Sequence, residues 1–315
     1  MRPILIASFL AGLVLRLPAF GAAPRRPAAE RSINVDGRER TYRIFLPQRV
    51  SNPAPVVLCL HGGSGNAAQM ERYSQFDDVA ERQGFIVVYP ESVGGNWNDG
   101  RGEPAIRAQR ENIDDVKYLR AVVDDVAGQH AIDHTRVFAT GISNGGMMSH
   151  LLAADASDLV AAIAPVVGGM PAAWADQFAP GRPVSILIIQ GEADPIVPFN
   201  GGEVTVGRAK RGKLISTPDA LRKYARLNGN AEPPQTTTLD AKAADSTAVE
   251  ITRYPPGTGG AKTELYVVKG GGHAWPGRPQ YLPESTIGKA SQAFAASAVI
   301  WDFFKSCPAR VASEK

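Results

Sequence analysis

Cysteine is scarce in this 315-residue sequence, and neither sign of charge dominates it. Only Cys59 and Cys307 are present, so at most one disulfide can form within the chain. Lysine and arginine number 34 against 31 acidic residues, a formal net charge of +3, which argues against a nucleic acid partner. We expect the one basic cluster, from Arg208 to Lys213, to be a solvated loop. Hydrophobic residues make up 44%, which excludes a disordered chain.

Long apolar runs are absent except at the amino terminus. There, a positively charged start precedes an apolar stretch from Pro3 to Phe20, and small residues follow as far as Ala23. Arg16 interrupts the stretch, whereas an uncleaved membrane anchor needs about 20 consecutive apolar residues. The pattern therefore predicts a secretory signal cleaved near Ala23, and a secreted or periplasmic protein. The predicted organisation is a signal peptide over residues 1–23, a linker over 24–34, one catalytic domain over 35–307 and a tail over 308–315.

Short apolar runs alternate with helical patterns through the rest of the chain. The predicted strands are Thr41–Leu46, Val56–Leu60, Phe85–Tyr89, Val137–Thr140, Ala161–Val167, Ser185–Gln190 and Glu264–Val268. Helices are predicted from Asp114 through Val126, over Ser143–Ala154, from Ser216 or Thr217 to Asn228, and over Ser291–Phe304. Residues 199–215 and 230–262 break the alternation and are predicted to be loops or insertions. The alternation predicts an α/β fold with a mostly parallel sheet and helices on both faces.

A candidate nucleophile lies between a predicted strand and a predicted helix. Gly141, Ser143 and Gly145 form the pattern Gly-x-Ser-x-Gly in that context. The turn is so tight that a side chain at either glycine would collide with the neighbouring strand and helix. The turn lifts the Ser143 hydroxyl above the sheet edge, where the helix N-terminus adds a partial positive charge.

A serine nucleophile needs a base and an acid that orients the base. In a fold with this turn, the acid and then the histidine follow the serine along the chain. Of five histidines, only His273 lies beyond the Ser185–Gln190 strand. Asp194 lies in the loop at the carboxyl end of that strand, where open α/β sheets place their chemistry. We therefore predict a Ser143–His273–Asp194 triad, with Glu192 as the nearest rival for the acid.

Two backbone donors are needed for the oxyanion that forms during acyl transfer. One is the N–H of Asn144, directly after the nucleophile. The other is expected in the loop after the first buried strand, where Gly63 and Ser64 are both candidates. The sequence does not decide between them.

Three further residues are candidate substrate contacts. Trp275 lies two residues after His273, so we expect its ring to border the pocket and stack on an aryl or acyl group, with packing of its own loop as the alternative. Trp97 is the second candidate, although a core position is the stronger expectation. His61 is the third, although a role in ordering its loop is the stronger expectation.

The ordered set of motifs resembles a known family. The motifs are Leu60-His61-Gly62-Gly63, Tyr89-Pro90, Trp97-Asn98, Asp114-Asp115-Val116, Gly141–Met148, Gly191–Pro198, Gly270–Pro276 and Ile300–Phe304. They resemble the secreted esterases known as polyhydroxybutyrate depolymerases and feruloyl esterases, over about residues 35–305. The resemblance implies an α/β-hydrolase fold and a serine carboxylic-ester hydrolase with Ser143, Asp194 and His273 at the triad positions. It implies feruloyl or acetyl esters of plant polysaccharide, or hydroxyalkanoate oligomers, as substrates.

These features together predict a secreted serine esterase that needs neither metal nor cofactor. His273 takes the proton of Ser143, an acyl-enzyme forms, and water then releases the acid. We expect a monomer that acts on a small-molecule or oligomeric ester, without nucleic acid and, after signal cleavage, without a membrane. Small aryl or short acyl esters are expected to react faster than long-chain lipids. A serine peptidase, an acyltransferase and a non-catalytic binding protein remain the alternatives.

The two cysteines are predicted not to pair. Cys59 ends its strand near the active-site edge, whereas the last helix is expected to run about 20 Å away from that edge before Cys307. A disulfide needs Cα atoms within about 7 Å of each other. We expect Cys59 to be buried and Cys307 to lie near the surface.

Overall fold

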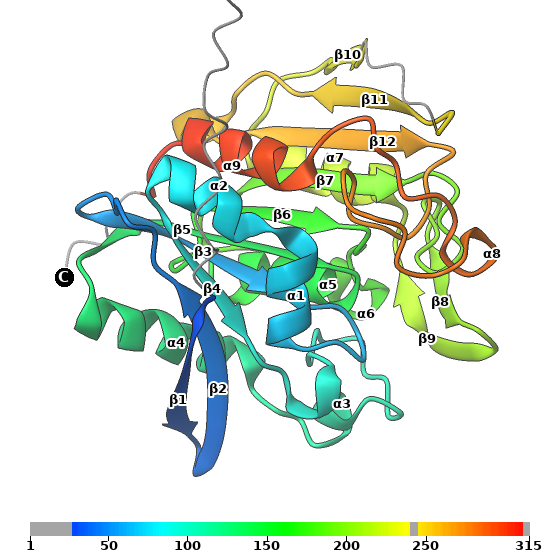
Figure 1. Ribbon diagram of the computed structural model, residues 1–315. Coiled ribbons are helices and arrows are strands. Elements are labelled where there is room, and N and C mark those ends of the chain that lie inside the picture. Colours follow the sequence, from blue (N-terminus) through cyan, green and yellow to red (C-terminus); the bar gives the residue numbers. More distant parts are fainter. Residues whose placement is uncertain (1–26, 240–244, 311–315) are drawn as a thin grey trace, which may run out of the picture.

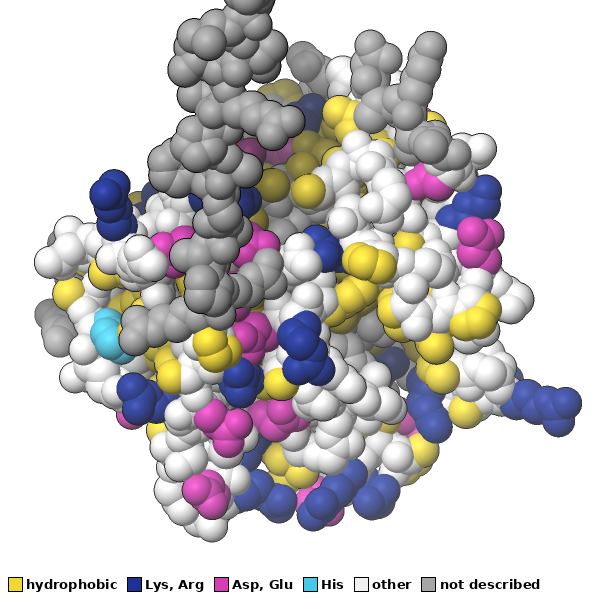
Figure 2. All heavy atoms as spheres, in the orientation of Figure 1, with side chains coloured by type: hydrophobic (Ala, Val, Ile, Leu, Met, Phe, Trp, Pro, Cys, Tyr) yellow, Lys and Arg dark blue, Asp and Glu magenta, His cyan; other side chains and the backbone are white. Residues whose placement is uncertain are grey.

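The computed structural model of the protein describes residues 27–239 and 245–310 (Figure 1). The predicted signal peptide, the first residues of the predicted linker and the end of the predicted tail lie outside these residues. Within the described part, no helix is both long enough and apolar enough to cross a membrane. Basic and acidic side chains are interspersed over the face seen in Figure 2.

A ten-stranded sheet forms the centre of the molecule, in the order β1-β2-β4-β3-β5-β6-β7-β12-β11-β10. The six strands from β4 to β12 run parallel, and the two outer strands at each end are antiparallel. In chain order their bounds are β1 Ala29–Val35, β2 Arg38–Phe45, β3 Ala54–Leu60, β4 Ile86–Pro90, β5 Ile132–Ile142, β6 Ala162–Val166, β7 Ser185–Gly191, β10 Gln235–Thr238, β11 Ala248–Arg253 and β12 Thr263–Lys269. The central strands are buried on both faces, which explains their continuous apolar runs.

Helices cover both faces of the sheet (Figure 1). The helices α1 Ala67–Ser74, α2 Phe76–Gln83 and α9 Ala296–Ser306 pack on one face, and α4 Asp115–Gln129, α5 Asn144–Asp155 and α7 Thr217–Leu227 pack on the other. Alternate residues of β3 enter the two apolar layers, since Leu58 packs with the α4 side and Cys59 with the α9 side. The short helices are α3 Arg107–Arg110, α6 Ala172–Ala175 and α8 Glu284–Ile287, with 3-10 turns η1 Val93–Gly95 and η2 Thr258–Gly260. The predicted α/β architecture is therefore present.

Several segments predicted as loops are strands. Residues 199–215 contain an antiparallel hairpin of β8 Gly202–Val206 and β9 Ala209–Leu214, and residues 230–262 contain β10 and β11. The predicted linker is also wrong from Ala29 onward, because this stretch is β1 and pairs with β2. These strands lie at a sheet edge, next to one in the case of β11, or outside the main sheet, so they bury few side chains and their composition is as polar as that of a loop.

The last helix begins at Ala296 rather than at the predicted Ser291. The residues before it form turns that attach to the loop after His273. The Gly277 N–H donates to the carbonyl of Ser291 at 2.7 Å, and the Ala296 N–H donates to the carbonyl of Pro276 at 3.0 Å. The start of α9 is therefore fixed beside the candidate site.

Both cysteines are free, as predicted, and both are buried. The prediction that Cys307 lies near the surface is wrong, because only 4% of it is exposed. It packs in the same apolar layer as Cys59, close to Ser185 at the start of β7, so the end of α9 does lie at the opposite edge of the sheet. Burial raises the pKa of the Cys307 thiol to about 12 and also raises the pKa of Cys59.

Candidate active site

Ser143 sits in a strained turn between β5 and α5. Its φ of 56° and ψ of −119° are rarely adopted by a non-glycine residue. The flanking glycines make the turn possible. A Cβ atom at Gly145 would lie 2.4 Å from the carbonyl oxygen of Leu60, and one at Gly141 would lie 2.6 Å from the carbonyl carbon of Gly145. The strain is held by the surrounding structure, including a hydrogen bond from the Ser143 N–H to the carbonyl of Val166 at 2.9 Å.

Asp194 and His273 are in direct contact. His273 Nδ1 lies 2.8 Å from Asp194 Oδ2, and the two side chains are 5% and 0% exposed. The other carboxylate oxygen, Oδ1, accepts the N–H groups of Ile196 and Val197 at 2.8 and 2.9 Å. These donors fix the carboxylate, which orients His273 with its Nδ1 proton toward Asp194 and leaves Nε2 able to accept a proton.

The rival acid, Glu192, is placed elsewhere. Its Oε1 lies 2.8 Å from Lys269 Nζ in an exposed ion pair. It makes no contact with His273 in the structure, although both residues are among those described. The geometry therefore favours Asp194 as the partner of the histidine.

Hydrogen bonds to the hydroxyl groups of two tyrosines, one donating and one accepting, hold the loop that carries His273. The Tyr281 hydroxyl donates to the carbonyl of His273 at 3.1 Å, and the Trp275 N–H donates to the Tyr73 hydroxyl at 3.3 Å. The two rings meet edge to face, with centroids 5.4 Å apart. Gly272 is required for this packing, since a Cβ there would lie 2.1 Å from the carbonyl oxygen of Ile287.

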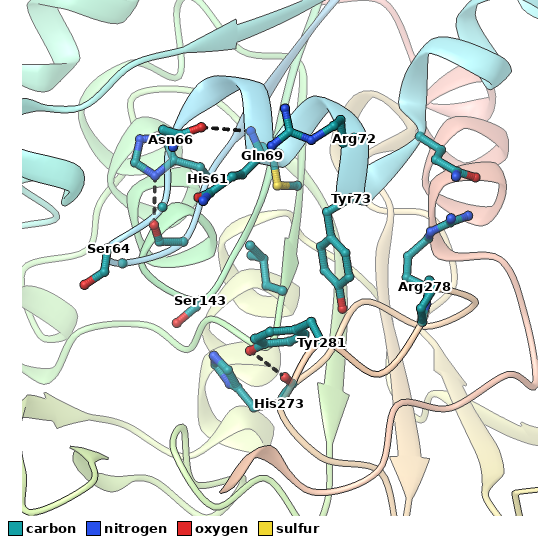
Figure 3. A pocket seen from close by; sticks show the side chains of 17 residues that line it. His61, Ser64, Asn66, Gln69, Arg72, Tyr73, Ser143, His273, Arg278 and Tyr281 are labelled. Carbon is teal, nitrogen blue, oxygen red and sulfur yellow. Dashed lines mark hydrogen bonds between the residues drawn. The ribbon is translucent and has the colours of Figure 1, made fainter. Parts of the chain in front are cut away.

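Ser143 and His273 open onto one cavity of about 650 Å³ (Figure 3). Its walls are the 61–66 loop, α1 and residues 278–281. Asp194 is not among the lining residues, because it lies buried behind His273. In the described structure no hydrogen bond joins the Ser143 hydroxyl to the imidazole. Such bonds are often long in a free enzyme and tighten when substrate binds.

Backbone hydrogen bonds near the nucleophile distinguish between Gly63 and Ser64 as the second oxyanion donor. The Ser64 N–H already donates to the carbonyl of Gly95 at 2.8 Å, so it is not free to donate to an oxyanion. The N–H groups of Gly63 and Asn144 have no acceptor among the described residues. A Cβ atom at Gly63 would lie 3.9 Å from Asn144 Cβ, so the two backbones lie side by side. This geometry favours Gly63 over Ser64.

The side chain of Asn144 is clamped by a buried network that the sequence analysis did not predict. Its Oδ1 accepts the Trp97 N–H at 2.7 Å, and its Nδ2 donates to Asp99 Oδ2 at 2.6 Å. Asp99 is fully buried and also accepts from Arg101 Nε at 2.9 Å. The network fixes the first residue of α5, whose N–H is a candidate oxyanion donor.

Of the predicted substrate contacts, only His61 lines the cavity. Its Nδ1 lies 2.8 Å from the carbonyl oxygen of Gly62, and its Nε2 accepts the Ser92 N–H at 3.2 Å. Both ring nitrogens therefore order the loop. Trp97 is a core residue, fully buried, and its indole N–H donates to the carbonyl of His61 at 2.9 Å.

The expectation that Trp275 borders the pocket is wrong. Its ring is fully buried, its indole N–H donates to Ser297 Oγ at 3.0 Å, and it packs edge-on against Phe76. The chain after His273 turns beneath α9 before it returns to the cavity. Proximity in sequence does not reveal that turn.

The aromatic wall of the cavity comes instead from Tyr73 and Tyr281, and its charged residues include Arg72 and Arg278. None of these four residues was among the predicted substrate contacts. Two signals could have found them. Arg278 and Tyr281 follow His273 within eight residues, and Arg72 and Tyr73 lie in the first helix after the 61–66 loop.

Comparisons with known proteins agree on an esterase. Residues 40–173 match the family described as Esterase PHB depolymerase. The chain is 31% identical to the putative esterase NocK of Nocardia uniformis subsp. tsuyamanensis, over 90% of this chain and 86% of that protein. It is 29% identical to feruloyl esterase B of Piromyces equi over 70% of this chain but only 40% of that protein. It is 33% identical to poly(3-hydroxyalkanoate) depolymerase C of Paucimonas lemoignei, over 39% and 30%.

Among solved structures, the chain is similar to an acetyl xylan esterase from Aspergillus awamori. The TM-score is 0.60 at 17% identity, covering 78% of this chain and 94% of that one. At this identity the likeness concerns the fold, which is the predicted α/β-hydrolase fold.

Proposed function

Because the chain belongs to the esterase family that includes the polyhydroxybutyrate depolymerases, we propose that it hydrolyses carboxylic esters with Ser143 as nucleophile, His273 as base and Asp194 as orienting acid. One observation carries the proposal. The strained Ser143 turn and His273 face the same cavity, and Asp194 lies behind His273, 2.8 Å from its Nδ1. Three segments far apart in the sequence supply these groups, which is the arrangement that acyl transfer requires.

The reaction follows from the positions of these groups. His273 Nε2 takes the proton of the Ser143 hydroxyl as its oxygen attacks the ester carbonyl. The N–H groups of Gly63 and Asn144 then hold the oxyanion, in a site where they are already oriented. The histidine returns its proton to the leaving alcohol, and an acyl-enzyme remains. Water, deprotonated by the same imidazole, releases the acid and restores Ser143.

The cavity supports small esters as substrates. A volume of about 650 Å³ suits an aryl or short acyl group, and the edge-to-face pair of Tyr73 and Tyr281 offers an apolar wall. Relatives named for feruloyl esters, acetylated xylan and hydroxyalkanoate polymers support the same range. We propose that aryl and short acyl esters react faster than long-chain lipids.

We also infer that the protein is exported. The support is the amino-terminal sequence, with its apolar stretch and its small residues at Gly21 to Ala23. Sequencing the amino terminus of the protein recovered from the periplasm or the medium tests this, since it should begin close to residue 24.

The test of the proposed function is hydrolysis of nitrophenyl acetate by Ser143→Ala. We expect kcat to fall about 10⁴-fold or more, because binding and the oxyanion donors alone remain. Ser285→Ala, an exposed serine on α8, is the matched control and should keep wild-type activity. Near-normal turnover by Ser143→Ala would show that another group is the nucleophile.

A further inference from the structure

The charged side chains that line the cavity are of one sign. Arg72 on α1 and Arg278 on the loop after His273 both line it, and none of its 17 lining residues is an aspartate or glutamate. Over the whole chain acidic residues are nearly as numerous as basic ones, 31 against 34. The cavity is therefore electropositive in a protein whose overall charge is nearly balanced.

Neither cavity arginine has a carboxylate partner among the described residues. Arg278 is half-buried, and its Nε is buried with no hydrogen-bond acceptor in the described structure. The guanidinium groups of Arg40 and Arg101 are paired, with Asp115 at 2.7 Å and with Asp99 at 2.9 Å, whereas Arg310, away from the cavity, also has a buried Nε without an acceptor among the described residues. A half-buried, unpaired guanidinium is unusual because its desolvation is not compensated within the protein. An anionic ligand in the cavity would compensate it.

The position of Arg278 separates this charge from the reacting atoms. In Figure 3 the ring of Tyr73 lies between Ser143 and the side chain of Arg278. Arg72 projects from the same helix as Tyr73, one residue before it. In Figure 3 the Arg72 side chain extends toward Gln69, on the other side of Tyr73 from Arg278. An ester bound at Ser143 that extends past the Tyr73 ring therefore approaches Arg278.

We propose that the cavity selects esters that carry a carboxylate distal to the scissile bond, that Arg278 binds that carboxylate, and that Arg72 adds positive charge from the other side of Tyr73. Monoesters of dicarboxylic acids and short hydroxyacid oligomers with a free carboxyl end belong to this class. A planar guanidinium can donate two parallel hydrogen bonds to a carboxylate, so Arg278 acts as a specificity residue rather than in the chemical step. The proposal rests on the proposed esterase function and names the substrate class of the same site.

The test compares matched substrates that differ only in that charge. The nitrophenyl monoester of adipic acid carries a carboxylate on the acyl side, and its methyl ester is the neutral counterpart. Acetoxyhexanoate and acetoxyhexanamide form the corresponding pair on the alcohol side. We expect the wild type to prefer the acid of at least one pair by about tenfold in kcat/KM, a preference that falls as salt is added.

The variants assign the preference to residues. Arg278→Gln should remove most of the preference, Arg72→Gln part of it, and Arg278→Lys should keep more of it than Arg278→Gln because the charge remains. Arg226→Gln removes an exposed arginine on α7 and is the control, with the preference unchanged. If Arg278→Gln does not fold, the wild-type ratio and Arg72→Gln still decide.

The outcomes separate this inference from the function it rests on. Equal hydrolysis of acid and neutral esters in both pairs would overturn the anion site while leaving the esterase intact. A preference that survives in both glutamine variants would overturn the assignment to these arginines. No hydrolysis of any of the four esters would overturn the proposed function, and the anion site with it.

Discussion

Replacing Asp194 by asparagine tests how the acid orients the base. The two oxygens of Asp194 have different partners, and this decides how the new amide must sit. Oδ1 accepts the N–H groups of Ile196 and Val197, so only the amide oxygen can occupy that position. The amide NH₂ must then take the place of Oδ2, 2.8 Å from His273 Nδ1.

The consequence for His273 is a change of tautomer. An NH₂ group facing Nδ1 turns that nitrogen into an acceptor, so the ring proton moves to Nε2. Nε2 can then no longer accept the proton of Ser143. In serine proteases, the change from aspartate to asparagine lowers kcat about 10⁴-fold for this reason, with the geometry intact. We expect a loss of about the same size here for Asp194→Asn.

The assay is kcat for nitrophenyl acetate at neutral pH, together with the melting temperature. Glu192→Gln is the matched control, since its exposed ion pair with Lys269 is expected to contribute about 1 kcal/mol or less to stability and nothing to the site. A loss of less than about tenfold in a folded Asp194→Asn protein would refute the tautomer argument.

Two further predictions concern the scaffold of the site. Gly145→Ala should abolish folding or activity, because its Cβ would lie 2.4 Å from the carbonyl oxygen of Leu60. Gly128→Ala in α4 is the matched control, because its Cβ would meet nothing within 4 Å; it should raise the free energy of unfolding by about 0.5–1 kcal/mol, as measured by urea denaturation. Burial lowers the pKa of His150 from 6.5 to about 3, so the unfolded chain binds more protons in that window and stability should fall as the pH drops from 6.5 toward 3. Measured by urea denaturation between pH 6.5 and 3, the free energy of unfolding should fall less steeply with decreasing pH in His150→Gln than in the wild type. An equal pH dependence in the two proteins would contradict the assignment of this effect to His150.

Local sequence patterns, namely apolar runs and the Gly-x-Ser-x-Gly motif, predicted most of the fold. Strands buried on both faces, such as β3 and β7, read as continuous apolar runs, and the Gly-x-Ser-x-Gly turn identified the junction of β5 and α5. The strands β1, β10 and β11, at or next to a sheet edge, were missed for a physical reason. In β11, which lies between β12 and the edge strand β10, only Val249 and Ile251 are buried, which leaves too weak an alternation to separate a strand from a loop.

Chain order and sequence motifs were enough to predict the triad residues but not the other residues of the site. Chain order selected His273 and Asp194, which the structure places in contact. The choice between Gly63 and Ser64 depended on a hydrogen bond to Gly95, a contact between two loops that no sequence pattern records. The direction of Trp275 likewise depended on how its loop packs under α9. Side-chain direction in loops is set by tertiary packing, so the sequence could indicate which segments border the cavity but not which of their side chains line it.

The most direct test of the central claim is covalent labelling of the native enzyme by a serine-directed fluorophosphonate, with the modified peptide identified by mass spectrometry. We predict one phosphonyl group per chain, on Ser143, with activity lost in proportion to labelling. We also predict that Asp194→Asn labels far more slowly, because its His273 cannot take the proton. Full labelling at another residue, or full labelling of Ser143 with activity retained, would contradict the account.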